Sequence, residues 1–125
     1  MDVVLTLATR YLDGTLTIAV TGELDIATSR QLLACLDAVF IQMARPRGDR
    51  SGDQAAVGGA VDEVVIDTGG VSFIDAHGLG ALVALQNRAR NHGIALRLAD
   101  PSAAVRRILS ITGLRHRLLP HSGMA

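Results

Sequence analysis

Residues 67–80 read Asp-Thr-Gly-Gly-Val-Ser-Phe-Ile-Asp-Ala-His-Gly-Leu-Gly. The apolar run 64–66 in front of this stretch predicts a buried strand, and the glycine pair 69–70 predicts a turn after it. Residues 71–74 make a second apolar step that leads to Asp75. We expect Asp75 to cap a helix, because its carboxylate can accept hydrogen bonds from the backbone N–H groups of the first turn.

Two glycines, Gly78 and Gly80, fall inside the first turn of that expected helix. Each costs a helix interior about 1 kcal/mol relative to alanine. Their presence therefore indicates that another group approaches the start of the helix closely. That group is either a neighbouring strand of the same domain or a partner protein, and the sequence leaves both possibilities open.

The chain before this stretch predicts a hairpin followed by a helix. The mostly apolar residues 3–8 and the alternating residues 16–20 flank the turn dipeptide Asp13-Gly14, as two antiparallel strands would. Thr28 is followed three residues later by a glutamine, which is the spacing of a capping box. Apolar residues at helical intervals then continue to Met43, so we expect a helix that begins near Thr28.

The second half of the chain predicts alternating strands and helices. Residues 63–67 form a central strand with a continuous apolar middle, and the helix that follows Asp75 ends at Gly93. Residues 94–98 predict another strand, and Asp100 followed by a proline predicts the cap and first residue of a last helix. Together with the hairpin, this alternation predicts an α/β fold: a single mixed β-sheet, with the hairpin first and parallel strands after it, and helices packed on it.

One segment has no hydrophobic periodicity. Residues 45–60 are rich in glycine, arginine and aspartate, so we expect a flexible loop inserted into a single domain that spans residues 1–125. Replacing this loop with a short Gly-Ser linker should change the stability little, because loop closure costs only about 0.6 kcal/mol per doubling of loop length.

Composition excludes several classes of function. The formal net charge is zero and aromatic residues make up 2% of the chain, so neither the basic surface nor the stacking platforms of a nucleic-acid-binding protein are expected. Cys35 is the single cysteine, which excludes an internal disulfide. The sequence shows neither a signal peptide nor an apolar run long enough to cross a bilayer, so we expect a cytoplasmic protein without direct membrane insertion.

Three segments resemble the STAS domain family, which includes bacterial anti-sigma-factor antagonists. Phe73-Ile74-Asp75-Ala76-His77-Gly78-Leu79-Gly80 is similar to the family pattern Phe-Ile-Asp-Ser-Ser-Gly-Leu-Gly at the start of a helix. Residues 22–28 are similar to its Gly-x-Leu-Asp-x-x-Thr segment, and residues 105–114 to its C-terminal helix and stop. The three matches follow one another in the family order across nearly the whole chain, and the resemblance implies a STAS fold.

The chain departs from the family pattern at one informative position. In the phosphorylated members a serine stands directly before the first helical glycine, where a partner kinase modifies it. His77 occupies that position here and Ala76 precedes it, so neither can become a phosphoserine. Three interpretations of His77 remain open: a contact in a partner interface, a tolerated replacement, or a phosphohistidine.

The resemblance implies a function and a binding surface. It implies an anti-sigma-factor antagonist that binds a kinase-like anti-sigma factor and frees the sigma factor for transcription, without control by the usual serine phosphorylation. The partner-binding residues that it implies are Asp25, Thr28, Asp75, Ala76, His77, Gly78 and Leu79. The alternatives are a STAS subunit of a membrane transporter complex and a small-ligand or nucleotide-binding sensor.

No constellation of catalytic residues is visible in the sequence. We find no Ser–His–Asp grouping with supporting glycines and no phosphate-binding loop with a lysine, and the histidines lack metal-ligand spacing. We therefore expect no enzyme activity, no cofactor and no metal. Thr68 and Ser72, the hydroxyls beside the central motif, are interpreted as hydrogen-bond donors to the turn backbone rather than as phosphorylation sites.

Overall fold

The computed structural model describes residues 5–43 and 61–119, so the predicted loop 45–60 lies outside the described residues. Its elements are, in chain order, β1 (Thr6–Leu12), β2 (Thr15–Leu24), α1 (Ile26–Met43), β3 (Glu63–Ile74), α3 (Ala76–Asn91), β4 (Ala95–Ala99), α4 (Ala103–Thr112) and α5 (Arg115–Leu118). The four strands form one sheet in the order β1-β2-β3-β4, in which β1 and β2 are antiparallel and the other two pairs are parallel. The predicted α/β fold with a single mixed sheet is confirmed.

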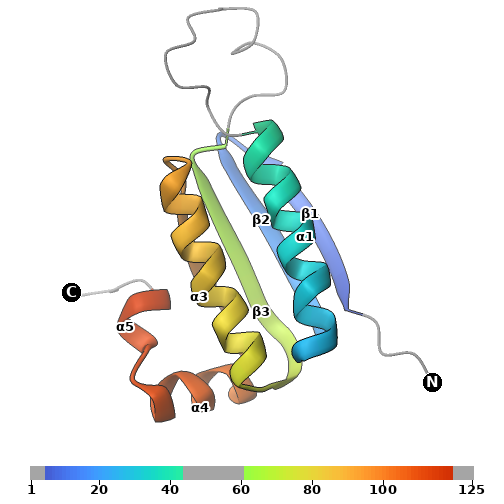
Figure 1. Ribbon diagram of the computed structural model, residues 1–125, viewed down its shortest axis with the longest axis vertical. Coiled ribbons are helices and arrows are strands. Elements are labelled where there is room, and N and C mark those ends of the chain that lie inside the picture. Colours follow the sequence, from blue (N-terminus) through green and yellow to red (C-terminus); the bar gives the residue numbers. More distant parts are fainter. Residues whose placement is uncertain (1–4, 44–60, 120–125) are drawn as a thin grey trace, which may run out of the picture.

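Helices α1 and α3 lie side by side on one face of the sheet, and α4 lies beyond the end of β3 (Figure 1). The core between these helices and the sheet is aliphatic, with fully buried side chains such as Ile18, Leu36, Ile66 and Leu82. Burying a side chain of this size contributes about 1.5–3 kcal/mol to stability. The aliphatic core therefore fixes how the two helices sit on the strands, and so where each helix begins.

The hairpin that opens the fold is the predicted one. Asp13 and Gly14 both have positive φ angles, of 51° and 83°, which is the geometry of a tight turn between antiparallel strands. The strands are longer than the apolar patterns suggested, because β1 continues to Leu12 and β2 continues to Leu24.

The predicted turn at Gly69 and Gly70 is wrong, because β3 runs without interruption from Glu63 to Ile74. Gly70 instead lies where β2 and β3 approach each other closely. A Cβ on Gly70 would lie 2.7 Å from the Thr21 Oγ1 on β2, and the register of β2 against β3 shifts at this point. Glycine is thus required for an irregularity in the sheet rather than for a reversal of the chain.

The predicted cap of the last helix is also wrong. Helix α4 begins at Ala103, and its cap is Ser102, whose Oγ accepts a hydrogen bond from the Val105 N–H at 3.2 Å. Asp100 lies two residues earlier, with a left-handed φ of 47°. The chain still turns between β4 and α4, so the proline after Asp100 precedes the helix instead of opening it.

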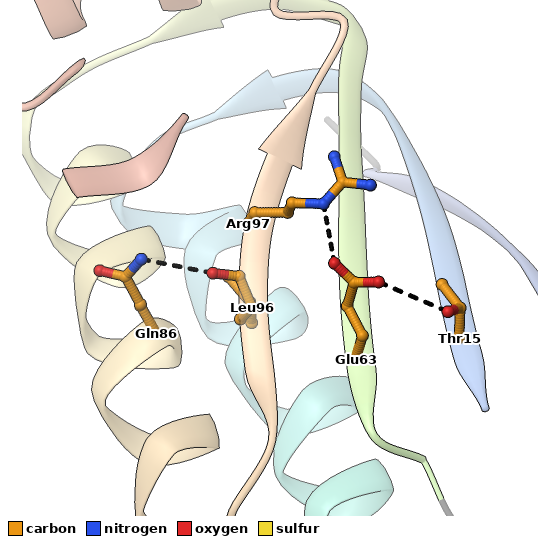
Figure 2. Close-up of polar contacts among 5 residues, drawn as sticks. All are labelled: Thr15, Glu63, Gln86, Leu96 and Arg97. Atoms are coloured by element: carbon orange, nitrogen blue, oxygen red, sulfur yellow. Dashed lines mark hydrogen bonds and ion pairs between the residues drawn. The ribbon is translucent and has the colours of Figure 1, made fainter. Parts of the chain in front are cut away.

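Polar contacts connect the strands at the end of the sheet where β3 begins (Figure 2). Arg97 Nε donates to Glu63 Oε2 at 2.8 Å, and the Thr15 hydroxyl donates to Glu63 Oε1 at 3.5 Å. Gln86 Nε2 on α3 donates to the backbone carbonyl of Leu96 at 3.3 Å. The half-exposed Arg97–Glu63 pair contributes at most about 1 kcal/mol, so the aliphatic core dominates the stability of the sheet.

Candidate functional site

The candidate site lies where two neighbouring parallel strands end. Leu24, the last residue of β2, pairs with Ile74, the last residue of β3. Each strand leads through a single aspartate, Asp25 or Asp75, into a helix. The starts of α1 and α3 therefore lie at the same end of the sheet (Figure 1), as the carboxyl ends of parallel strands require.

The start of α1 is held by reciprocal hydrogen bonds. Asp25 Oδ1 accepts from the N–H groups of Ala27 and Thr28, at 3.0 Å each. The Thr28 hydroxyl accepts from the Asp25 N–H at 3.0 Å and donates to the Glu23 carbonyl at 2.6 Å. The predicted helix is present as α1, but the capping role predicted for Thr28 is wrong: Asp25 is the cap, and Thr28 completes the capping box from within the helix.

These hydrogen bonds also favour the ionised form of the Asp25 carboxyl group. The backbone N–H of Thr28 is the main reason that the pKa of Asp25 lies below its ordinary value, and the backbone N–H of Ala27 adds to the effect. Asp25 is half-buried and ionised at neutral pH, which suits the positive end of a helix dipole.

The start of α3 has the predicted cap. Asp75 Oδ1 accepts from the Gly78 N–H at 3.0 Å, and the Asp75 N–H donates to the Leu24 carbonyl at 3.3 Å. A Cβ on Gly78 would overlap the Leu24 carbonyl oxygen and lie 3.0 Å from Ile74 Cγ1. The group that approaches the helix start at Gly78 is therefore the end of the neighbouring strand.

The second glycine of the motif has no such neighbour. A Cβ on Gly80 would meet no atom within 4 Å, and the residue is exposed. The two glycines of the motif thus differ, since packing within the fold requires Gly78 and places no demand on Gly80.

The seven candidate residues separate into two groups by exposure. The buried group maintains the shape of the site and consists of Thr28, Gly78 and Leu79. The exposed or half-buried group has accessible side chains and consists of Asp25, Asp75, Ala76 and His77. Only some of the residues that the sequence motif suggests are therefore accessible on the surface.

Large apolar side chains next to the site are unexpectedly exposed. Phe73 on β3 is 47% exposed, and Ile26 and Ile111 are 55% and 73% exposed. Strict alternation would place Phe73 on the same buried face as Val71. Val71 and Phe73 pair with the consecutive residues Gly22 and Glu23 of β2, so β3 has one extra residue here and the alternation breaks. No signal in the sequence marks that irregularity.

The two hydroxyls beside the motif differ in their contacts. The Ser72 hydroxyl donates to the Gly22 carbonyl at 3.4 Å, so it bonds to the backbone as predicted, but to strand β2 and not to a turn. Thr68 is completely buried, and its hydroxyl has no hydrogen-bond partner among the described residues. The predicted hydrogen bond from Thr68 to the backbone is therefore absent from this part of the chain.

Within residues 5–43 and 61–119, no three His, Cys, Asp or Glu side chains gather in an arrangement that could hold a metal ion. Over the same residues, no helix has both the length and the apolar character that a membrane span needs.

Comparison with known proteins assigns the family. The family model of the STAS domain matches residues 6–122. The chain belongs to the STAS domain family. STAS domains are known mainly as regulatory or interaction domains, and the match includes all seven candidate residues. No curated protein sequence matches the chain.

Solved STAS structures share the fold. An anti-sigma factor antagonist from Mycobacterium paratuberculosis is 24% identical with a TM-score of 0.66, over 94% of this chain and 87% of that one. The antagonist SpoIIAA in its unphosphorylated form is 22% identical with a TM-score of 0.62, over 87% of this chain and 82% of that one. SLC26A9 is 21% identical with a TM-score of 0.60, over 85% of this chain but 17% of the SLC26A9 chain. The fold thus makes up most of the chain in the two antagonists, whereas it makes up a small part of the much longer SLC26A9 chain.

Proposed function

We propose that this chain is an anti-sigma-factor antagonist, which binds a kinase-like anti-sigma factor in the cytoplasm and frees the sigma factor for transcription. The observation that carries the proposal is the pair of helix starts at one end of the sheet, where half-buried Asp25 and Asp75 lie beside exposed Ala76 and His77. The fold shared with solved anti-sigma factor antagonists supports it.

We propose further that serine phosphorylation does not control this interaction. His77 is exposed, and the resemblance to the family pattern aligns it with the serine of the phosphorylated members; residues 73–80 contain neither serine nor threonine. The antagonist then acts by mass action, in proportion to its concentration and its affinity for the anti-sigma factor. Incubation with the cognate kinase and labelled ATP should leave residues 73–80 unlabelled, and label on any of them would contradict the proposal.

A charge placed at position 77 tests the surface directly. His77→Asp adds an anion at the positive end of α3, which should leave the fold intact or stabilise it by about 0.3–1 kcal/mol. The same charge should weaken binding by about 2–5 kcal/mol if the anti-sigma factor covers this helix start. Titration calorimetry with the anti-sigma factor recovered by the wild-type chain measures the affinity, and melting curves measure the stability.

Two further variants complete this experiment. Asn91→Asp places the same charge at the exposed opposite end of α3 and should bind like the wild type. His77→Ser should preserve binding and restores the hydroxyl that a matching kinase modifies. If His77→Asp is folded and binds as tightly as Asn91→Asp, the start of α3 is not the interface.

The structural similarity to SLC26A9 favours one second candidate, a STAS subunit of a transporter complex. Purification from native extract separates the possibilities. An anti-sigma factor in the purified material supports the first proposal, whereas a transporter or its ATPase supports the second. A bound small molecule detected by native mass spectrometry would support a sensor instead.

A further inference from the structure

A groove opens beside the start of α3, between the end of β3 and α4. Its volume is about 350 Å³. Its walls are mainly apolar and include Ser72, Phe73 and Ile74 from β3 and Arg107, Ile108 and Ile111 from α4. Two of these side chains, Phe73 and Ile111, are among the most exposed large apolar residues that the structure describes.

The groove is continuous with the proposed binding surface. Ile74 lines the groove, directly precedes the cap Asp75, and lies against Gly78. A stable protein interface covers about 800 Å² and 20–30 residues on each partner. The four accessible residues of the two helix starts are far fewer, so a partner that covers them must also cover neighbouring surface.

Interface chemistry favours this groove as that neighbouring surface. The centre of an interface is apolar, and exposed aromatic side chains in pockets supply a large share of the binding energy. Phe73 has these properties, because it is 47% exposed and forms one wall of the groove. An apolar side chain of the partner would remove this surface from water.

Arg107 adds a charge at the side of the groove. It is exposed and, over residues 5–43 and 61–119, has no ion-pair partner. No carboxylate occurs on α4, whose sequence from 103 to 112 is AAVRRILSIT. An arginine next to an apolar groove complements a carboxylate that lies beside an apolar side chain.

We propose that the groove takes an apolar side chain of the anti-sigma factor, and that Arg107 pairs with an Asp or Glu beside that side chain. This inference rests on the proposed function and adds the chemistry of the partner segment. The segment has to present an apolar residue and an acidic residue together on its surface.

Paired variants test the inference by titration against the anti-sigma factor recovered with the wild-type chain. Ile111→Gln makes the groove polar, and Ile41→Gln is its control, because Ile41 is 75% exposed on α1 outside the groove. Arg107→Glu reverses the charge at the groove, and Arg106→Glu is its control on the neighbouring exposed residue. We expect each groove variant to lose about tenfold or more in affinity, while each control stays within about twofold of wild type.

The outcomes distinguish this inference from the proposed function. If His77→Asp weakens binding but both groove variants bind like their controls, the groove is not part of the interface and the inference fails alone. If the wild-type chain does not bind an anti-sigma factor, both proposals fail. If sedimentation instead shows a dimer that Ile111→Gln dissociates, the occupant of the groove is a second copy of this chain. Melting curves that match those of the controls establish that the groove variants are folded.

Discussion

The two helix starts at the candidate site have the same cap residue but are held in different ways. At α1, Asp25 and Thr28 exchange hydrogen bonds, and the Thr28 hydroxyl also binds the Glu23 carbonyl. At α3, the Asp75 carboxylate accepts from the Gly78 N–H, and the backbone of Gly78 packs directly against Leu24. Hydrogen bonds thus fix one helix start, and close packing fixes the other.

This difference has a consequence for binding. Thr28 uses its side chain inside the fold, whereas packing through a glycine leaves the adjacent side chain unconstrained. His77, next to Gly78, is therefore exposed on a helix start whose position is set by backbone contact. In the proposed interface, α3 thus contributes the exposed His77, whereas the buried Thr28 side chain of α1 is used within the fold.

Gly78→Ala should have the largest effect on this arrangement. The added Cβ would overlap the Leu24 carbonyl oxygen, and a backbone atom cannot move aside as a flexible side chain can. We expect a loss of about 3 kcal/mol in the free energy of unfolding, as for overpacked cores. Urea denaturation of the purified variant measures this loss.

Gly80→Ala is the matched control, because it makes the same change two residues later where a Cβ meets no atom within 4 Å. Alanine should stabilise the helix there by up to about 1 kcal/mol. Equal effects at the two positions would show that close packing at Gly78 does not fix the start of α3.

Thr28→Val should have an intermediate effect, at the other helix start. Valine preserves the shape of the buried side chain but leaves the Asp25 N–H and the Glu23 carbonyl without the hydroxyl. We expect a loss of about 1–2 kcal/mol in stability, because two hydrogen bonds between the hydroxyl and partly buried backbone groups are lost. Stability unchanged from wild type in urea denaturation would contradict the role of this hydroxyl in fixing α1.

Asp25→Asn should have the smallest effect, and one that depends on pH. Asparagine caps helices about as well as aspartate, so the variant removes mainly the charge. Since the folded-state pKa of Asp25 lies below its ordinary value of 3.8, the ionised carboxylate stabilises the fold above that pH and loses this effect as the pH falls through the folded-state pKa.

The wild type should therefore exceed Asp25→Asn in stability at neutral pH, and the difference should shrink below the ordinary pKa of 3.8. Denaturant titrations of both proteins over this range measure the difference. A gap that grows on acidification would mean that the carboxylate is not held in its charged form by the hydrogen bonds of Thr28.

Local chemistry made several features predictable. Asp13-Gly14 specifies its turn because both positions need positive φ, and Asp75 specifies a helix start because its carboxylate reaches the N–H of Gly78. The alternation of strands and helices specified the class of the fold. The turn and the cap each depend on residues within a few positions of one another.

Other features depend on contacts between distant segments, and the sequence pattern was misleading there. Gly69 and Gly70 have the composition of a turn, yet they lie inside β3 because Gly70 must pass close to Thr21 on β2. Phe73 belongs to an apolar run, yet a register shift between β2 and β3 leaves it exposed. Thr28 has the spacing of a cap, yet α1 begins two residues earlier at Ile26, and Asp25 caps it by accepting from the N–H groups of Ala27 and Thr28.

The linear chain thus determined the fold class, the hairpin, the cap of α3 and the motif that places the chain in the STAS family. The assembled fold determined which residues of that motif are accessible, that Gly78 is fixed by the neighbouring strand, and that an apolar groove with Arg107 adjoins the start of α3. The physical reason is the distance along the sequence between the residues that make the deciding contacts. Caps and turns are settled by hydrogen bonds and φ preferences within four residues, whereas exposure and grooves arise where β2, β3 and α4 meet across long stretches of chain.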